Sequence, residues 1–236
     1  MKRAEAAALD RLAARHALDA GRSAALARLL DALAAEPDPP TAIRSRAQAL
    51  DGHVADSLSG LQVPELVGAA RIADVGAGAG FPGLALAAVL PRTAVDLIEA
   101  ARRKADVIDR LIAASGLAQA RSVARRVEDW GREEGAGAYD AVTARAVAPL
   151  AVLIEYAAPL LEPGGVLVAW KGRRSAEEER AGDAAAKLMG MAGGGVLAVT
   201  PFEGAHSRHL HVYRKVGPTP DGFPRRAGMA AKRPLA

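Results

Sequence analysis

A glycine-rich turn within residues 72–90 constrains the fold more than any other stretch of the chain. Apolar residues before the turn predict a buried strand, and apolar residues after it predict a short helix. Gly76, Gly78, Gly80 and Gly83 allow the backbone to bend with positive φ and to approach a ligand closely. The N-terminus of the following helix would direct free N–H groups at that ligand. The stretch therefore predicts a nucleotide-like cofactor site rather than a plain strand-to-helix turn.

Segments typical of strands and helices alternate from residue 71 to residue 217. We expect helices near 102–116, 149–161 and 175–191, and strands at 71–75, 94–99, 121–127, 139–144, 164–171, 196–200 and 210–216. The last two strands resemble a terminal hairpin. The alternation predicts an α/β fold with a doubly wound, mainly parallel sheet, and a ligand at the carboxyl ends of its strands.

The first seventy residues are predicted to be helical and carry no cofactor signal. Two apolar helical faces are formed by Leu9, Leu12, Ala13 and His16, and by Leu26, Leu29, Leu30 and Leu33. The prolines within 36–40 end the second helix, and a third segment runs from 41 to 50. On spacing alone, His53 is a core histidine, and Asp56 and Ser57 cap a turn. We therefore predict a helical region at 1–70, a Rossmann-like domain at 71–217 and a basic tail at 218–236.

Composition narrows the classes of protein that fit. Half of the 236 residues are apolar, which is enough for a sizeable core. The absence of cysteine excludes disulfides and thiolate metal sites and suits a reducing cytosol. No apolar run has transmembrane length, and the N-terminus lacks the apolar block of a signal peptide. We expect a cytoplasmic protein with no membrane association.

Two cofactors fit the glycine turn. Glu99 closes the second expected strand, about 20 positions after the first glycine, where a carboxylate can accept hydrogen bonds from ribose hydroxyls. NAD and S-adenosylmethionine both carry that ribose. Pro82 removes an N–H that a dinucleotide loop would use for pyrophosphate. The run 160–168, followed by a closing antiparallel strand, is typical of class I S-adenosylmethionine-dependent methyltransferases. We therefore favour S-adenosylmethionine over NAD.

Local matches spread along the chain resemble one family. They are His53-Val-Ala-Asp-Ser57, Asp74-Val-Gly-Ala-Gly-Ala-Gly-Phe-Pro-Gly83, Arg126-Val-Glu128, Ala144-Arg-Ala146 and Trp170-Lys-Gly172. The chain is similar to the RsmG (GidB) family, bacterial methyltransferases that act on guanine N7 in 16S ribosomal RNA, at guanine 527 in the usual rRNA numbering. The resemblance implies a class I methyltransferase fold with an N-terminal helical extension, and 16S rRNA or the small ribosomal subunit as partner.

The resemblance also implies roles for individual residues. The positions that it assigns to the cofactor, together with Glu99, are Gly76, Gly78, Phe81, Val127, Glu128 and Arg145. Phe81 would line the methionine side, and Val127 and Glu128 would bind adenine through a carboxylate or a backbone carbonyl. Arg145 and Lys171 are the candidate catalytic residues, although Lys171 could equally be structural. Arg208 matches a family arginine and is a candidate RNA contact.

Methylation of guanine N7 requires no general base, because this nitrogen has a free in-plane lone pair. An arginine fork on O6 and N7 would occupy the nucleophile, so Arg145 or Lys171 should contact O6 or phosphates. Asp56 is a candidate acceptor for the Watson–Crick edge. Residues 206–211 contain three histidines, which we interpret as exposed strand residues rather than as metal ligands. We expect no metal.

The C-terminal tail is the second predicted RNA contact. Arg225, Arg226 and Lys232 stand among prolines and glycines that disfavour a regular helix or a central strand. Such a segment can follow a phosphate backbone, and removing it should leave cofactor affinity unchanged. Arg44 and Arg46 favour RNA as well. Two alternatives stay open, an NAD-dependent oxidoreductase and a non-catalytic nucleotide-binding protein associated with RNA. We expect a monomer.

Overall fold

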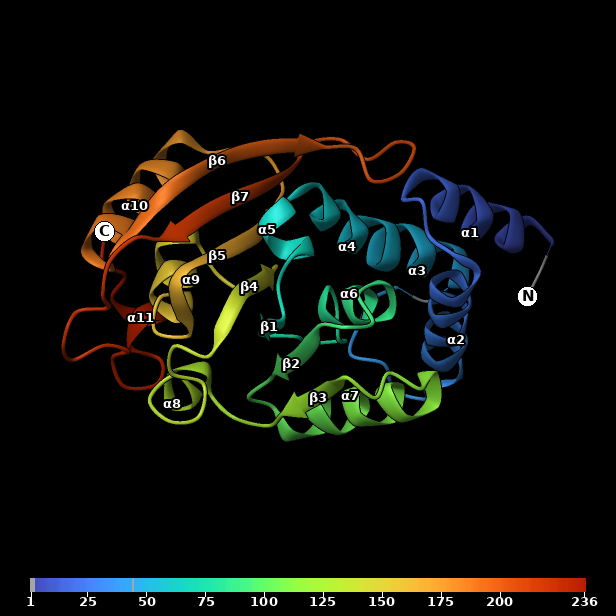
Figure 1. Ribbon diagram of the computed structural model, residues 1–236, viewed down its shortest axis with the longest axis horizontal. Helices are drawn as coiled ribbons and strands as arrows, with labels where there is room; N and C mark the ends of the chain where they lie inside the picture. Colours follow the sequence, from blue (N-terminus) through green and yellow to red (C-terminus); the bar gives the residue numbers. More distant parts are fainter. Residues whose placement is uncertain (1–2, 44) are drawn as a thin grey trace.

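The computed structural model describes residues 3–43 and 45–236, and its strands form one sheet in the order β3-β2-β1-β4-β5-β7-β6 (Figure 1). The strands are β1 Arg71–Val75, β2 Ala94–Ile98, β3 Ala120–Val123, β4 Tyr139–Arg145, β5 Leu161–Lys171, β6 Met191–Val199 and β7 Arg208–Lys215. β1 to β5 are parallel, and β7 runs antiparallel between β5 and β6. This arrangement confirms the predicted doubly wound sheet and its closing hairpin.

Helices cover both faces of the sheet (Figure 1). The longer ones are α1 Arg3–Arg15, α2 Ala20–Ala35, α6 Gly83–Val89, α7 Arg102–Ser115, α9 Leu150–Ala157 and α10 Ala176–Leu188. Short helical turns are α3 Arg46–Ala49, α4 Asp56–Leu58, α5 Pro64–Val67, α8 Val127–Trp130 and α11 Met229–Lys232. None of the helices in the described part of the chain combines the length and the apolar character that crossing a bilayer requires.

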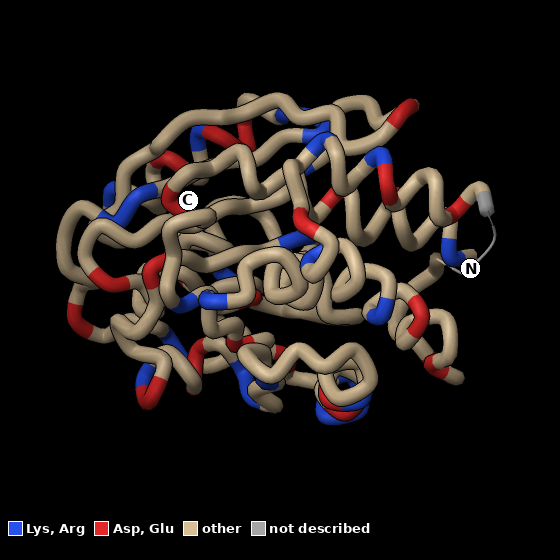
Figure 2. Tube along the Cα trace, turned by 45° about the vertical axis from the view of Figure 1, so that its right-hand side comes forward, with Lys and Arg blue, Asp and Glu red and all other residues tan. Residues whose placement is uncertain are grey.

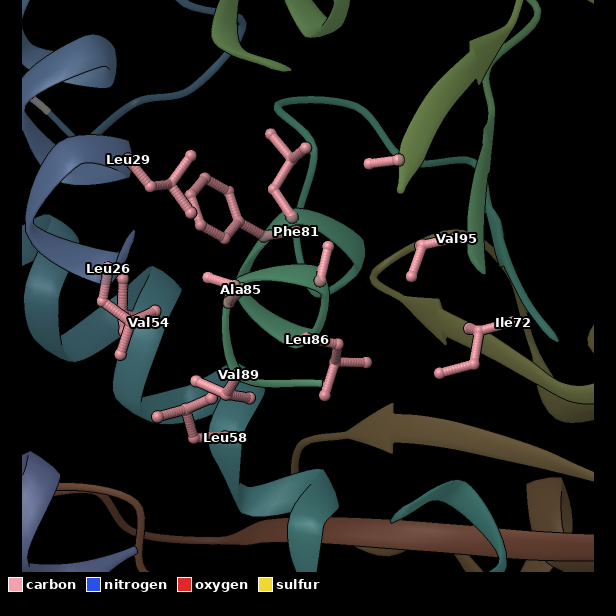
Figure 3. Packing of buried hydrophobic residues seen from close by; sticks show 14 of the residues in the cluster. Leu26, Leu29, Val54, Leu58, Ile72, Phe81, Ala85, Leu86, Val89 and Val95 are labelled. Carbon is pink, nitrogen blue, oxygen red and sulfur yellow. The ribbon is translucent and has the colours of Figure 1, made fainter. Parts of the chain in front are cut away.

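Alternation along the strands divides the apolar side chains between two cores. On β1, Ile72 faces the core that contains α2 and α6, whereas Ala73 and Val75 face the core that contains α9 and α10. Figure 3 shows α6 between the N-terminal helices and the sheet, with Val54 and Leu58 packed nearby. The N-terminal helices therefore share a core with the sheet, and the boundary at residue 70 remains a prediction.

Several boundaries differ from the sequence-based expectation. β3 ends at Val123, because its parallel partner β2 ends at the paired Ile98, and α8 occupies part of the stretch predicted to be strand. The third helix begins at Arg46 behind the cap Ser45 rather than at residue 41. Residues 50–62, where Asp56 and Ser57 were expected to cap a turn, continue this helix through a π-helical turn, α4 and a final 3₁₀ turn.

Candidate functional site

The glycine turn lies at the carboxyl end of β1 and is held by a buried carboxylate. Gly76, Gly78 and Gly80 have φ of 64°, 58° and 91°. Asp74 accepts hydrogen bonds from the Gly83 N–H at 2.9 Å and from the Thr143 hydroxyl at 2.7 Å. Burial raises the pKa of Asp74 to about 6 against the effect of these bonds. Sequence reasoning assigned Asp74 no role, although a carboxylate directly before a glycine turn was the available signal.

The turn presents an open face beside Glu99. A Cβ on Gly78 would meet nothing closer than the Gly76 carbonyl oxygen at 3.8 Å, so that side of the turn is free for a ligand. A Cβ on Gly76 would lie 2.8 Å from the Val147 side chain. Glu99 accepts from the backbone N–H of Gly78 at 3.0 Å and of Ala101 at 2.8 Å. The structure thus brings Gly76, Gly78 and Glu99 together, as the cofactor prediction requires.

Phe81 points into the core beneath the turn. Its side chain packs beside Leu29 of α2, and the residue is 4% exposed (Figure 3). Its ring stacks on His53 with centroids 4.6 Å apart and 7° between the planes. His53 Nε2 lies 2.9 Å from the Thr41 hydroxyl, and burial lowers the pKa of His53 to about 4, with help from the charge of Arg145. These contacts agree with the interpretation of His53 as a core residue.

Arg145 connects the end of β4 to the helical run that follows residue 50. Its Nη1 donates to Asp56 Oδ2 at 2.8 Å and to the Gly52 carbonyl at 3.2 Å. The side chains of Arg145 and Asp56 are 14% and 8% exposed, so the ion pair is largely shielded from water. Trp170, at the end of β5, donates from Nε1 to the Asp56 carbonyl at 2.9 Å. Three motifs far apart in the sequence thus meet, a connection that spacing could not reveal.

A pocket of about 350 Å³ opens next to this junction. Lys171 lies on its wall, pairs with Glu178 at 2.5 Å and donates to the Ala148 carbonyl at 3.2 Å. The residues that line the pocket are Asp56, Arg145, Ala146, Val147, Ala148, Trp170, Lys171, Gly172, Val199, Arg208 and His209. The structure therefore gathers the predicted catalytic pair and Arg208 around one cavity. No motif or spacing in the sequence indicated that Glu178 would pair with Lys171.

Val127 and Glu128 lie in α8, at the carboxyl side of β3. Both residues are buried. Glu128 Oε1 accepts from the backbone N–H of Gly228 at 2.7 Å, so the C-terminal tail reaches this part of the site. The predicted adenine-binding pair is therefore adjacent to residues that were expected to contact RNA.

The tail packs against the protein instead of extending away from it. Arg225 makes a bidentate pair with the buried Glu155, at 2.7 Å for Nε and 2.5 Å for Nη2. Arg226 and Lys232 are exposed. The tail also contains α11, so the expectation that it forms no helix was wrong for this single turn. Its prolines lie outside that turn, which explains why the turn can form.

The histidines near β7 differ from the expectation that all are exposed. His211 is 3% exposed, because it pairs with β5 inside the sheet, and burial lowers its pKa. His209 Nδ1 lies 2.8 Å from the Gly172 carbonyl oxygen. Among residues 3–43 and 45–236, no group of three or more histidine, cysteine or acidic side chains is placed to hold a metal ion.

Basic and acidic residues are interspersed along the chain rather than separated into halves (Figure 2). Arg46 pairs with Asp31, and its Nε lies 3.8 Å from Glu5 Oε2. Arg46 therefore contributes to the packing of the N-terminal helices. Arg44 lies outside the described residues. Arg208 is exposed at the rim of the pocket. The pocket rim and the exposed tail residues are therefore the candidate positions for RNA contacts.

Comparison with solved structures supports the fold. A predicted O-methyltransferase from Agrobacterium tumefaciens superposes with a TM-score of 0.54 at 24% identity and covers 69% of this chain and 81% of its own. The O-methyltransferase domain StiE, residues 961–1257, gives a TM-score of 0.54 at 14% identity, with 68% and 73% coverage. The fold is that of class I S-adenosylmethionine-dependent methyltransferases.

Sequence comparison identifies the family. The family described as rRNA small subunit methyltransferase G (GidB) matches residues 40–210. Ribosomal RNA small subunit methyltransferase G of Rubrobacter xylanophilus is 45% identical over 78% of this chain and 72% of its own. The proteins of the same name from Chloroflexus aggregans and Deinococcus radiodurans are 41% and 40% identical, each over 83% of this chain and over 82% and 78% of their own lengths. The chain therefore belongs to the rRNA small subunit methyltransferase G family.

Proposed function

We propose that this protein transfers a methyl group from S-adenosylmethionine to N7 of a guanine in 16S ribosomal RNA, guanine 527 in the usual numbering. The observation that carries the proposal is the pocket lined by Arg145, Lys171 and Arg208. Val147, which also lines this pocket, packs against Gly76 of the glycine turn. Family membership favours this reaction over nicotinamide-dependent oxidation and over a role without catalysis. Small-subunit ribosomal RNA as substrate supports a cytoplasmic location.

The cofactor residues fit the methyl donor. S-adenosylmethionine supplies a methyl group on a positively charged sulfur. Gly78 leaves the turn open, and Glu99 can accept from ribose hydroxyls in addition to the two backbone N–H groups that it already holds. Because the Glu128 carboxylate is bonded to Gly228, we assign adenine recognition to the backbone around Val127 as well as to the remaining carboxylate oxygen.

The pocket suits a reaction that places positive charge on the base. The purine becomes cationic as N7 is methylated, and an unpaired arginine nearby would oppose that charge. Arg145 is instead compensated by Asp56, and Lys171 by Glu178. Both cations can direct N–H groups at O6 or a phosphate without adding net charge to the pocket. The enzyme then contributes mainly alignment and exclusion of water, on the order of 7 kcal/mol or more for ideal geometry.

RNA contacts belong to exposed cations around the pocket. Arg208 lies on the pocket wall, and Arg226 and Lys232 are exposed on the tail. The target guanine must leave the stack to reach a pocket of this size. We assign Arg225 a structural role instead of an RNA contact, because its guanidinium pairs with the buried Glu155.

The proposal is tested with S-adenosylmethionine carrying a labelled methyl group and with small ribosomal subunits that lack the modification. Label in 16S rRNA, mapped to N7 of one guanine, supports it. Naked 16S rRNA assayed in parallel identifies which form is the substrate. Label on another atom or another RNA, or binding of NAD in preference to S-adenosylmethionine, would overturn it.

A further inference from the structure

The C-terminal tail, residues 218–236 (here the C-terminal segment), packs against the face of the domain that carries α8 and α9. The Thr219 hydroxyl donates to the Ala158 carbonyl at 3.0 Å, and Arg132 Nη2 donates to the Pro224 carbonyl at 2.8 Å. Phe223 and Leu235 pack against the core on that face. In Figure 1, α11 lies beside α8 and α9 at the opposite end of the molecule from α1.

Two buried carboxylates anchor the middle of this segment. The side chain of Glu155 on α9 is 1% exposed, and both of its oxygens accept from Arg225. Glu128 on α8 is 3% exposed and accepts from the N–H of Gly228, whose φ is 76°. Buried carboxylates are costly without partners. The segment supplies partners for both, which ties its position to that of Glu128.

Pairing of β2 with β3 in the sheet brings the segment that contains Glu128 close to Glu99. The Glu99 N–H donates to the Val123 carbonyl at 3.0 Å, so the residues that follow β3 lie next to the ribose acceptor. A nucleoside whose ribose is held by Glu99, with its reactive end at the glycine turn, extends its base toward the residues after β3. Glu128 belongs to these residues, and the C-terminal segment lies directly behind it.

We propose that the C-terminal segment forms the supporting wall of the adenine end of the cofactor site. Gly228 positions Glu128 directly, and Arg225 holds the segment in place through Glu155. This inference rests on the proposed binding of S-adenosylmethionine. It replaces the expectation that removing the tail leaves cofactor affinity unchanged. By linkage, a segment that stabilises the cofactor site is itself stabilised by the cofactor to the same degree.

The reciprocal effect can be measured on the natural chain by limited trypsin digestion with and without saturating S-adenosylhomocysteine. Arg226 in the segment and Lys187 on α10 are both exposed cleavage positions, and Lys187 serves as the matched control. We expect the ligand to slow cleavage after Arg226 by at least about fivefold more than cleavage after Lys187. Equal slowing at the two positions would indicate general stabilisation and would overturn the inference.

Calorimetric titration of variants with S-adenosylhomocysteine provides the second test. Arg225→Ala should raise the Kd at least about fivefold, and Arg225→Lys should restore part of the affinity because one ammonium can still reach Glu155. Arg233→Ala, an exposed arginine of the same segment, should bind like the natural chain. An unchanged Kd for Arg225→Ala overturns the inference alone, and a natural chain that does not bind S-adenosylhomocysteine overturns the proposed function with it. Should Arg225→Ala fail to fold, the digestion decides.

Discussion

Replacing Arg145 by alanine should reduce stability as well as activity. Arg145 is the partner that the structure gives to the Asp56 carboxylate, at 2.8 Å, and the Asp56 side chain is only 8% exposed. The variant leaves this carboxylate without its counter-ion and leaves the Gly52 carbonyl without the guanidinium donor. The change therefore affects the junction between β4 and the helical run as well as the pocket.

The expected loss of unfolding free energy in Arg145→Ala follows from the burial of the Arg145–Asp56 ion pair. Removing one member of a buried ion pair costs about 3–5 kcal/mol. Because 14% of the Arg145 side chain is exposed, water can partly replace it, and we expect a loss near the lower end, ~3 kcal/mol. Domains have unfolding free energies of about 5–15 kcal/mol, so the variant should remain folded at room temperature.

Urea unfolding of three variants, measured beside the natural chain, separates the two roles. Arg145→Ala should lose the stated free energy of unfolding, and the double variant with Asp56→Ala should regain part of it, because no buried charge is left unpaired. Arg173→Ala, an exposed arginine beyond β5, is the control and should stay within about 0.5 kcal/mol of the natural chain. Both variants that lack Arg145 should fail to methylate RNA.

If Arg145→Ala unfolds at the same urea concentration as Arg173→Ala and methylates RNA normally, the ion pair with Asp56 is neither structural nor functional. If the double variant regains both stability and turnover, Arg145 acts only as the partner of Asp56, and its assignment as a catalytic residue is wrong.

Three further predictions concern the cofactor, pH and RNA. Glu99→Ala should weaken S-adenosylhomocysteine binding by about 1–3 kcal/mol in calorimetry, with the exposed Glu177→Ala as control; equal affinities would remove Glu99 from the ribose site. The pKa of His53 is about 4 in the folded protein and 6.5 unfolded, so the unfolded chain takes up the proton first and stability falls as pH drops from 6.5 to 4. Urea unfolding of His53→Gln at several pH values should lack this fall in unfolding free energy, which amounts to at most about 3 kcal/mol. Identical pH profiles for the variant and the natural chain would contradict the lowered pKa of His53. Arg208→Ala and Arg226→Ala should each lower the log–log salt slope of RNA binding by about 0.7–0.9 per lost phosphate contact without changing cofactor affinity; an unchanged slope would exclude that residue from the RNA surface.

The regular elements were largely predictable because they depend on local patterns. The apolar faces of α1 and α2, the glycine turn after β1 and the closing hairpin all follow from periodicity and from residues with special backbone freedom. The predicted bounds were wrong where contacts between distant segments determine where an element ends. β3 stops where β2 stops, and the helical run after Arg46 is stabilised by burial of His53 against Phe81, which spacing does not encode.

The sequence by itself determined the fold class, the position of the cofactor turn and the acid at the end of β2. These features are encoded within short stretches, since a strand, a glycine turn and a helix N-terminus are contiguous in the chain. It also carried the motifs by which the family is identified.

Only the tertiary structure decided which charges meet. Asp56 and Arg145 lie on segments 89 positions apart, and Glu128 and Gly228 are separated by 100. No local propensity relates such residues, because their proximity arises from the order of strands in the sheet and from the path of the tail over α8 and α9. The tail is therefore part of the packed domain, while its exposed Arg226 and Lys232 stay predicted RNA contacts. Burial of Glu128 and Glu155 requires partners, and the residues that supply them lie in the tail.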